Sequence, residues 1–175
     1  MRLFIACALP EGLVDTLTAA QRVLEGQAHF IRLAGIGQLH LTLRFIGETE
    51  DGMVQTIASW FKMQPVPMPA VLQVRLSEYG IFAKGNGQLI WAGLSCRTEL
   101  LYYVRSLEED LRGLGLSPEW RQWLPHVTLA RRMVLRCPFE GIQSLLPLNP
   151  RAFPLSAPKL YQSSFTPDGM RYSPI

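Results

Sequence analysis

Two short stretches carry the residues best suited to chemistry, His40-Leu41-Thr42-Leu43 and His126-Val127-Thr128-Leu129. Both read His-apolar-Thr-apolar, which is the two-residue period of a half-buried strand. Because successive strand side chains point to opposite faces, each histidine should share a face with its threonine, while the apolar residues face the core. The chain has only three histidines in 175 residues. A single histidine in such a frame could occur by chance, but two histidines in identical four-residue frames need an explanation.

The residue types in these two motifs fit acid–base chemistry at phosphorus. An imidazole, with an ordinary pKa of about 6.5, can give or take a proton near neutral pH. Two imidazoles on opposite sides of a substrate supply both the base that activates water and the acid that protonates a leaving oxygen. A threonine hydroxyl beside each histidine can donate a hydrogen bond to a phosphate oxygen. The motifs therefore predict a phosphoesterase site containing His40, Thr42, His126 and Thr128.

Other site chemistries lack their sequence signals. The chain has no HExxH, no third histidine in frame, no clustered carboxylates, no phosphate-binding glycine loop and no Gly-x-Ser-x-Gly turn. Cys7, Cys96 and Cys137 are odd in number, far apart and outside any CxxC pair. They are predicted to be reduced thiols, mostly buried, in a cytosolic protein. We expect neither a metal nor another cofactor.

Composition bounds the class of protein. Hydrophobic residues make up 48% and charged residues 18%, so the chain can bury a proper core and is not disordered. The net charge of +3 leans only mildly towards anionic partners. No apolar run approaches the roughly 20 residues of a membrane span. We expect a cytoplasmic monomer that does not bind membranes.

Periodicity and turn residues predict an α+β order of elements. Strands are expected at 2–9, 30–33, 39–46, 70–79, 89–94 and 126–131, and as a C-terminal hairpin of 159–165 and 170–173. Helices are expected at 10–26, at 50–62 with Thr49 as its cap, and at 99–113 with Thr98 as its cap. A turn is expected at 84–87, and 137–154 is predicted to be loose. Each half of the chain holds one motif strand. This indicates a single domain over residues 1–175, made of two intimately packed lobes facing each other across a cleft, with the proline-rich residues 64–69 as the boundary.

The chain resembles the two-histidine (2H) phosphoesterases, and among them the RNA 2′,3′-cyclic phosphodiesterases once called 2′-5′ RNA ligases (the ThpR/LigT type). Four blocks carry the resemblance in order along the chain. They are Arg2-Leu3-Phe4-Ile5-Ala6, residues 39–48 with the first motif, Pro125-His126-Val127-Thr128-Leu129-Ala130-Arg131, and Leu160-Tyr161-Gln162-Ser163-Ser164-Phe165 with Arg171-Tyr172. One departure is Trp123-Leu124-Pro125, where the family often has phenylalanine as the aromatic.

The resemblance implies a fold, an activity and roles for residues. The fold is a bilobal α+β structure of two mainly antiparallel sheets backed by helices around a central cleft, with a pseudo-twofold axis. The activity is metal-free hydrolysis of a terminal 2′,3′-cyclic phosphate, on RNA ends or nucleotides, to a 2′-phosphate. His40 would be the proton donor and His126 the proton acceptor. Thr42, Thr128 and Arg131 would bind the phosphate, although strict alternation places Arg131 on the core side unless the strand bends after Ala130.

Two alternative functions stay open. One is 2′-5′ RNA ligation, the reverse reaction, in which an RNA hydroxyl replaces water; water at about 55 M should outcompete it. The other is a module that binds a nucleotide or RNA end without turnover.

Residues around the motifs have simpler expected places. Phe4, Phe45 and Trp123 are predicted to be core residues, with one of them open to the cleft for stacking a base. Arg44 shares the parity of His40 and should point into the cleft or to solvent at its rim. The third histidine, His29, is expected on the surface or in a loop. Arg131, Arg132 and Arg136 are expected to be solvated charges, with a modest basic rim for RNA as the alternative.

Overall fold

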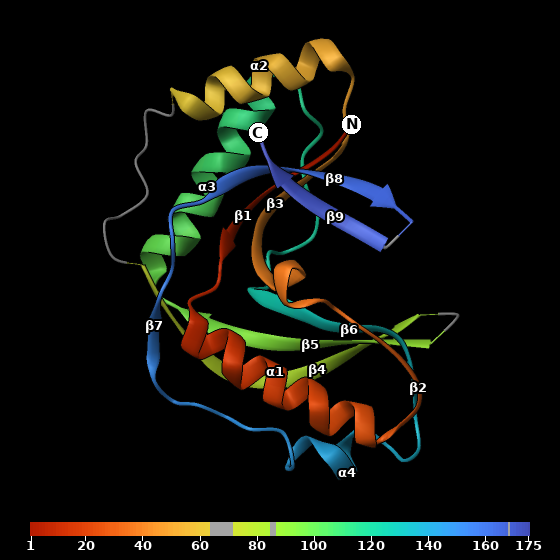
Figure 1. Cartoon of the computed structure of the whole chain (residues 1–175). Coiled ribbons are helices and arrows are strands. Elements are labelled where there is room, and N and C mark those ends of the chain that lie inside the picture. The colour runs from red at the N-terminus through yellow and green to blue at the C-terminus, as the bar shows by residue number, and fades with distance from the viewer. Residues whose placement is uncertain (64–71, 85–86, 168) are drawn as a thin grey trace.

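The computed structural model describes residues 1–63, 72–84, 87–167 and 169–175. Its strands form two antiparallel sheets, seen one above the other in Figure 1. The first sheet has the order β3-β1-β8-β9, and the second has the order β2-β6-β5-β4-β7. The expected α+β class with mainly antiparallel sheets is confirmed.

The observed elements follow the predicted order closely. The strands are β1 (Arg2–Ala8), β2 (Ala28–Leu33), β3 (His40–Glu48), β4 (Gln73–Lys84), β5 (Gly87–Cys96), β6 (His126–Leu135), β7 (Ala152–Pro154), β8 (Lys159–Thr166) and β9 (Gly169–Pro174). The helices are α1 (Glu11–Gly26), α2 (Asp51–Lys62), α3 (Thr98–Gly113) and the short α4 (Glu140–Gln143), with a 3₁₀ turn η1 (Ile36–Gln38).

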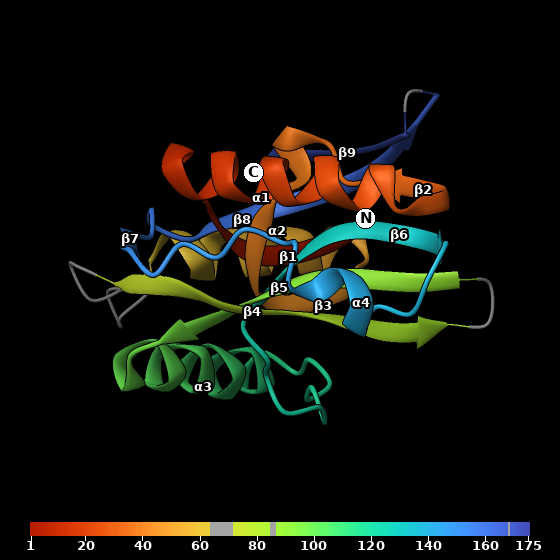
Figure 2. The same cartoon turned by 90° about the horizontal axis from the view of Figure 1, so that it is seen from below.

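The two sheets do not divide the chain into its two halves. Strand β2, from the first half, pairs with β6 in the second sheet, whereas β8 and β9 join β1 in the first sheet. Helix α1 packs on β2 and β6, and α3 packs on β3. Figure 2 shows these two helices on opposite sides of the strands. The simple picture of one lobe per half is therefore wrong. Residues 64–69, predicted as the boundary, lie outside the described part of the chain.

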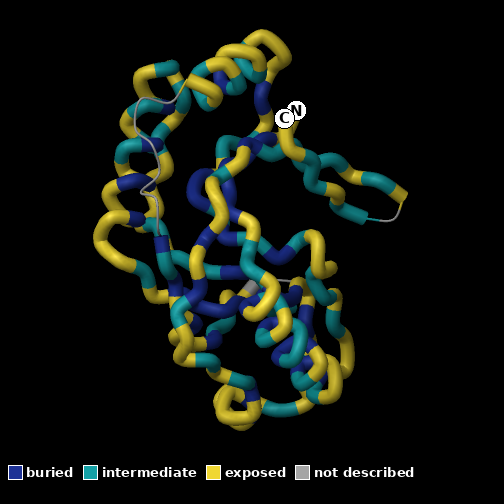
Figure 3. The backbone as a smooth tube through the Cα atoms, turned by 60° about the vertical axis from the view of Figure 1, so that its left-hand side comes forward, coloured by how far each residue is buried: buried dark blue, intermediate teal, exposed yellow. Residues whose placement is uncertain are grey.

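Apolar residues of both sheets and of all four helices form the core. Figure 3 colours the buried stretches of the backbone dark blue. The α1 stripe buries Leu13, Leu17, Ala20 and Leu24 at helical spacing, as its sequence predicts. The polar Gln21 is also buried, and its amide donates to the backbone oxygens of Ala34 and Leu129 at 2.8 and 2.9 Å. The bond to Leu129 connects α1 to β6, the strand that carries the second motif.

Both predicted helix caps are wrong. The Thr49 hydroxyl donates to the backbone oxygen of Gly47 (3.1 Å), and α2 begins after Glu50. Thr98 is the first residue of α3, and Arg97 precedes it as the cap residue without a side-chain capping bond. The segment 137–154, predicted to be loose, contains α4 and β7, and β7 pairs with the edge of β4.

The three cysteines are free thiols. Cys7 is fully buried in β1, and burial raises its pKa to about 12, which makes it unreactive near neutral pH. Cys96 and Cys137 are half-buried. Among the described residues, no helix has the length and apolar character that crossing a membrane requires.

Candidate active site

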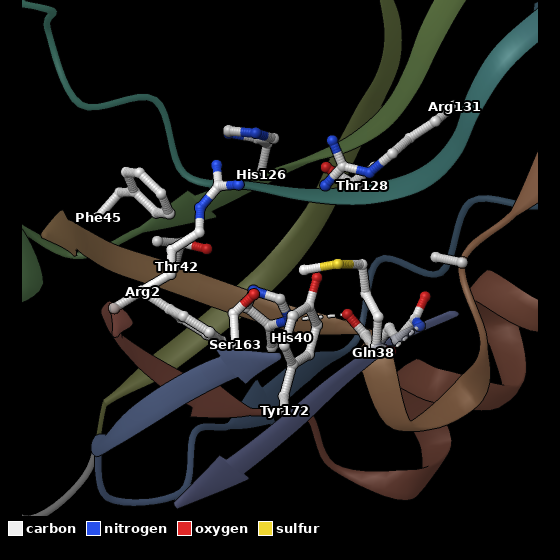
Figure 4. A pocket seen from close by; sticks show the side chains of 13 residues that line it. Arg2, Gln38, His40, Thr42, Phe45, His126, Thr128, Arg131, Ser163 and Tyr172 are labelled. Carbon is white, nitrogen blue, oxygen red and sulfur yellow. Dashed lines mark hydrogen bonds between the residues drawn. The ribbon is translucent and has the colours of Figure 1, made fainter. Parts of the chain in front are cut away.

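Both predicted motifs open onto one pocket between the two sheets (Figure 4). Its volume of about 310 Å³ lies at the lower end of the range of about 300–1,000 Å³ typical of small-molecule sites. The residues that line it are Arg2, Phe4, Ala34, Gln38, His40, Thr42, Phe45, His126, Thr128, Arg131, Ser163, Met170 and Tyr172. All five residues predicted for the site are therefore brought together. This lining, within the described chain, includes two arginines and no carboxylate, which favours an anionic ligand.

The two histidines are held in the same way. His40 Nδ1 lies 2.7 Å from the backbone oxygen of Gln38, and His126 Nδ1 lies 2.7 Å from that of Leu124. In each case the partner stands two residues earlier in the chain. A carbonyl oxygen can only accept a hydrogen bond, so each Nδ1 carries the proton. Nε2 of each ring is thus left as the nitrogen that can accept or donate a proton.

The His40 ring is packed against two aromatic side chains. Phe4 lies under the His40 ring with centroids 5.0 Å apart, and Tyr172 meets it edge-on at 5.2 Å. Burial lowers the pKa of His40 below its ordinary value, the bond to Gln38 opposes this, and the charges of Arg131 and His126 lower the pKa further. The neutral form of His40 is favoured while the pocket holds no anion.

This lowered pKa gives a stability prediction with a definite sign. Below about pH 6.5 the unfolded chain binds a proton at His40 more readily than the folded chain does. Stability should therefore fall as the pH drops from 7.5 through the folded-state pKa. Urea unfolding at pH 7.5 and pH 5 should show a larger loss for the wild type than for His40→Gln, which cannot titrate. A variant that loses as much stability as the wild type would contradict the assignment.

The two threonines lie beside the histidines on the pocket face, as the alternation predicts. His40 and Thr42 are half-buried while Leu41 and Leu43 are buried at 0% and 1% exposure, and the second motif repeats this pattern. Neither the Thr42 nor the Thr128 hydroxyl has a hydrogen-bond partner among the described residues. Both hydroxyls are thus available to a ligand.

A β-bulge lies at the end of each motif and changes the strand faces beyond it. In β3, Thr42 pairs with Ala6 and Arg44 with Ile5, so Leu43 is an extra residue. In β6, Thr128 pairs with Trp91 and Ala130 with Ile90, so Leu129 is an extra residue. The bulge therefore falls on the fourth residue of both motifs.

The bulges correct three predictions made from strict alternation. Arg131, which alternation assigns to the core side, is exposed and lines the pocket, because the bulge at Leu129 shifts the strand faces just before Ala130, after which a bend was expected. Phe45 is not a core residue: 41% of it is exposed, and it lines the pocket at the corresponding place. Arg44 points neither into the pocket nor to solvent, since only 9% of it is exposed.

Arg44 instead ties β3 to α3 and to the loop that follows it. Its guanidinium donates to Glu108, to the backbone oxygen of Phe45, and to the backbone oxygen of Ser117 at 2.6 Å. The Glu108 side chain is 23% exposed. Arg44 is thus a structural residue that supports the back of the first motif strand.

Arg44→Leu should lower the free energy of unfolding by about 1–3 kcal/mol, because it breaks a largely buried ion pair whose carboxylate can partly rehydrate. Urea denaturation measures the change. Arg22→Leu, at an exposed position on α1, is the matched control and should stay within about 0.5 kcal/mol of the wild type. Equal stability of the two variants would show that the pair contributes nothing.

The C-terminal hairpin forms one wall of the pocket, which sequence reasoning did not assign. Ser163 of β8 and Tyr172 of β9 line it, and the Gln38 amide donates to the backbone oxygen of Met170 at 2.6 Å. These residues lie in or next to blocks that match the family, but no periodicity distinguishes them. Arg2 is the unassigned lining residue that the sequence does distinguish, because it is a charged residue at the start of an otherwise apolar strand.

The aromatic residue before the second motif links the two halves of the site. Trp123 is half-buried, and its indole nitrogen donates to the backbone oxygen of Thr42 at 2.9 Å. It does not line the pocket. A phenylalanine at this position could not make this bond, because its side chain has no N–H donor. Trp123 thus connects the segment before the second motif to the strand of the first motif.

Comparisons with known proteins agree with this geometry. No protein-family model matches the chain. The RNA 2′,3′-cyclic phosphodiesterase of Methanocaldococcus jannaschii is 27% identical over all of this chain and 98% of its own length. That of Thermotoga maritima is 25% identical over 77% of this chain and 71% of its own.

Solved structures share the fold. The protein TT0787 of Thermus thermophilus matches with a TM-score of 0.80 at 24% identity, covering 100% of this chain and 95% of that one. E. coli LigT complexed with 3′-AMP matches with a TM-score of 0.75 at 22% identity, covering 99% and 94%. The bilobal, LigT-like fold is thereby confirmed. With a relative matched along the whole chain and both histidine motifs in one pocket, the chain is similar in sequence to RNA 2′,3′-cyclic phosphodiesterases and shares the fold of LigT.

Proposed function

We propose that this protein is an RNA 2′,3′-cyclic phosphodiesterase that opens the cyclic phosphate to a 2′-phosphate. The single observation that carries the proposal is the pair of histidines in one pocket, each with Nδ1 bound to a backbone carbonyl and Nε2 left for proton transfer. The names of the relatives support the reaction. The 3′-AMP bound to LigT, a protein of the same fold, supports a nucleotide ligand.

In the proposed reaction, water attacks phosphorus opposite the 3′-oxygen. His126 Nε2 takes a proton from the water as its oxygen bonds to phosphorus, and the bond from phosphorus to the 3′-oxygen breaks. His40 Nε2–H gives its proton to that oxygen, which leaves as the 3′-hydroxyl. The product carries its phosphate on the 2′-oxygen. His126 ends protonated and His40 neutral, and exchange with solvent restores both.

The lowered pKa of His40 bears on its role as the donor. In the free protein, the neutral ring is favoured. A bound phosphate brings a negative charge into the same pocket, which raises the pKa of a nearby imidazole and offsets the effect of burial. On this proposal, substrate binding itself favours the protonated form of His40, which then acts as the acid. The Thr42 and Thr128 hydroxyls and the Arg131 guanidinium would hold the phosphate oxygens.

Phosphorus NMR of the product from adenosine 2′,3′-cyclic phosphate tests the proposal. We expect a 2′-phosphate, in the presence of EDTA as in its absence, because both proton transfers belong to imidazoles. No turnover with tight nucleotide binding would indicate a binding module instead. A product joined to an added 5′-hydroxyl oligonucleotide would indicate ligation. A 3′-phosphate product would reverse the leaving oxygen and contradict the proposal.

A further inference from the structure

Arg2 is a pocket residue that the two motifs do not include. It begins β1, is exposed, and lines the pocket beside Thr42 and Phe45. Figure 4 shows its guanidinium between Phe45 and His126. Its Cζ lies 4.9 Å from the centroid of the Phe45 ring. Among the described residues, the only ion pair is Arg44–Glu108, so no carboxylate neutralises Arg2.

The ring of Phe45 holds the Arg2 guanidinium without occupying its hydrogen-bond donors. A cation over an aromatic face is attracted to that face. The N–H groups of a guanidinium lie in its plane, and in that plane they match two oxygens of a phosphate. The contact between the face of the guanidinium and the Phe45 ring thus positions Arg2, while its N–H groups remain available to a ligand.

The bulged strands show why this arrangement completes the site. Phe45 stands five residues after His40 (45 − 40 = 5), and Arg131 stands five residues after His126 (131 − 126 = 5). A bulge at the fourth residue of each motif turns Phe45 and Arg131 into the pocket. At this position the second motif has Arg131, whereas the first motif has Phe45. The Phe45 ring in turn contacts Arg2 of the neighbouring strand β1.

From this correspondence we propose that Arg2 is a second phosphate-binding residue, which serves the first motif as Arg131 serves the second. The inference rests on the proposed function and adds a residue to it. A cyclic phosphate carries one negative charge, whereas the 2′-phosphate product carries nearly two at pH 7.5. A second guanidinium therefore contributes most where charge accumulates, after water has attacked.

The test is to measure binding of adenosine 2′-monophosphate by titration calorimetry at pH 7.5. Arg2→Gln should weaken binding by about tenfold or more, the loss typical of a charge-assisted hydrogen bond. Arg2→Lys, which keeps the charge but not the plane, and Phe45→Leu, which removes the ring, should each give a smaller loss in the same direction. Arg22→Gln makes the same change in net charge on exposed α1 and should have no more than a twofold effect.

Two results would overturn the proposal. One is an Arg2→Gln variant that binds the 2′-phosphate as Arg22→Gln does. The other is an equal loss for adenosine, which has no phosphate and would assign Arg2 to the base. Thermal unfolding of each variant checks that the fold is retained, and the Phe45→Leu result stands if Arg2→Gln fails to fold. Because binding needs no turnover, a wild type that binds 2′-phosphate but hydrolyses nothing would sink the proposed function and leave this inference intact.

Discussion

Replacing either His40 or His126 with alanine is expected to lower kcat for a 2′,3′-cyclic nucleotide by about 10²–10⁴-fold. Each ring supplies one of the two proton transfers, and no other imidazole lines the pocket in the described chain. The double variant should be only slightly slower than the slower single variant, because an acid and a base that act in one step do not contribute additively. Steady-state kinetics of the four proteins measures this.

The third histidine provides the matched control. His29 is exposed on β2 and outside the pocket, so His29→Ala should turn over at the wild-type rate. Circular dichroism should show that all the variants keep their fold. Near-wild-type rates in His40→Ala or His126→Ala would end the two-histidine mechanism.

The residual activity of each variant should also separate the two roles. The wild-type rate should be bell-shaped in pH, since it needs one neutral and one protonated imidazole. Removing the proton donor His40 should abolish the decline at high pH, and removing the acceptor His126 should abolish the decline at low pH. The opposite pattern would exchange the two roles.

The second large effect is expected at the threonines. Thr42→Val and Thr128→Val keep the shape of the side chain and its preference for strand, but remove the free hydroxyl that faces the pocket. The loss of one donor to the charge that develops in the transition state typically costs about 10²–10³-fold in kcat. We expect a loss of this order in each variant, with little change in thermal stability.

Thr98→Val, at the exposed start of α3, is the control for the same chemical change away from the pocket. A variant at position 42 or 128 whose KM rises while kcat stays at the wild-type value would show that the hydroxyl binds substrate and transition state equally. That result would contradict its role in stabilising the transition state.

The amino-acid sequence by itself determined the chemistry of the site and the faces of its strands. Histidine and threonine at alternate positions must lie on one face of any strand, so His40 with Thr42, and His126 with Thr128, could be paired before the fold was known. The apolar residues between them decided which face is buried, because burying them is favourable in either sheet. Most helices and strands followed from the same periodicities, within a few residues at their ends.

Only the tertiary structure decided where alternation fails. A bulge arises from how a strand pairs with its neighbour, and the pairing of β1 with β3 and of β5 with β6 joins residues far apart in the sequence. Those bulges turned Phe45 and Arg131 into the pocket and buried Arg44. Long-range pairing also placed β2 in the second sheet and brought Arg2 over Phe45. Local periodicity contains no information about the neighbouring strand, and that is why these contacts could not be predicted.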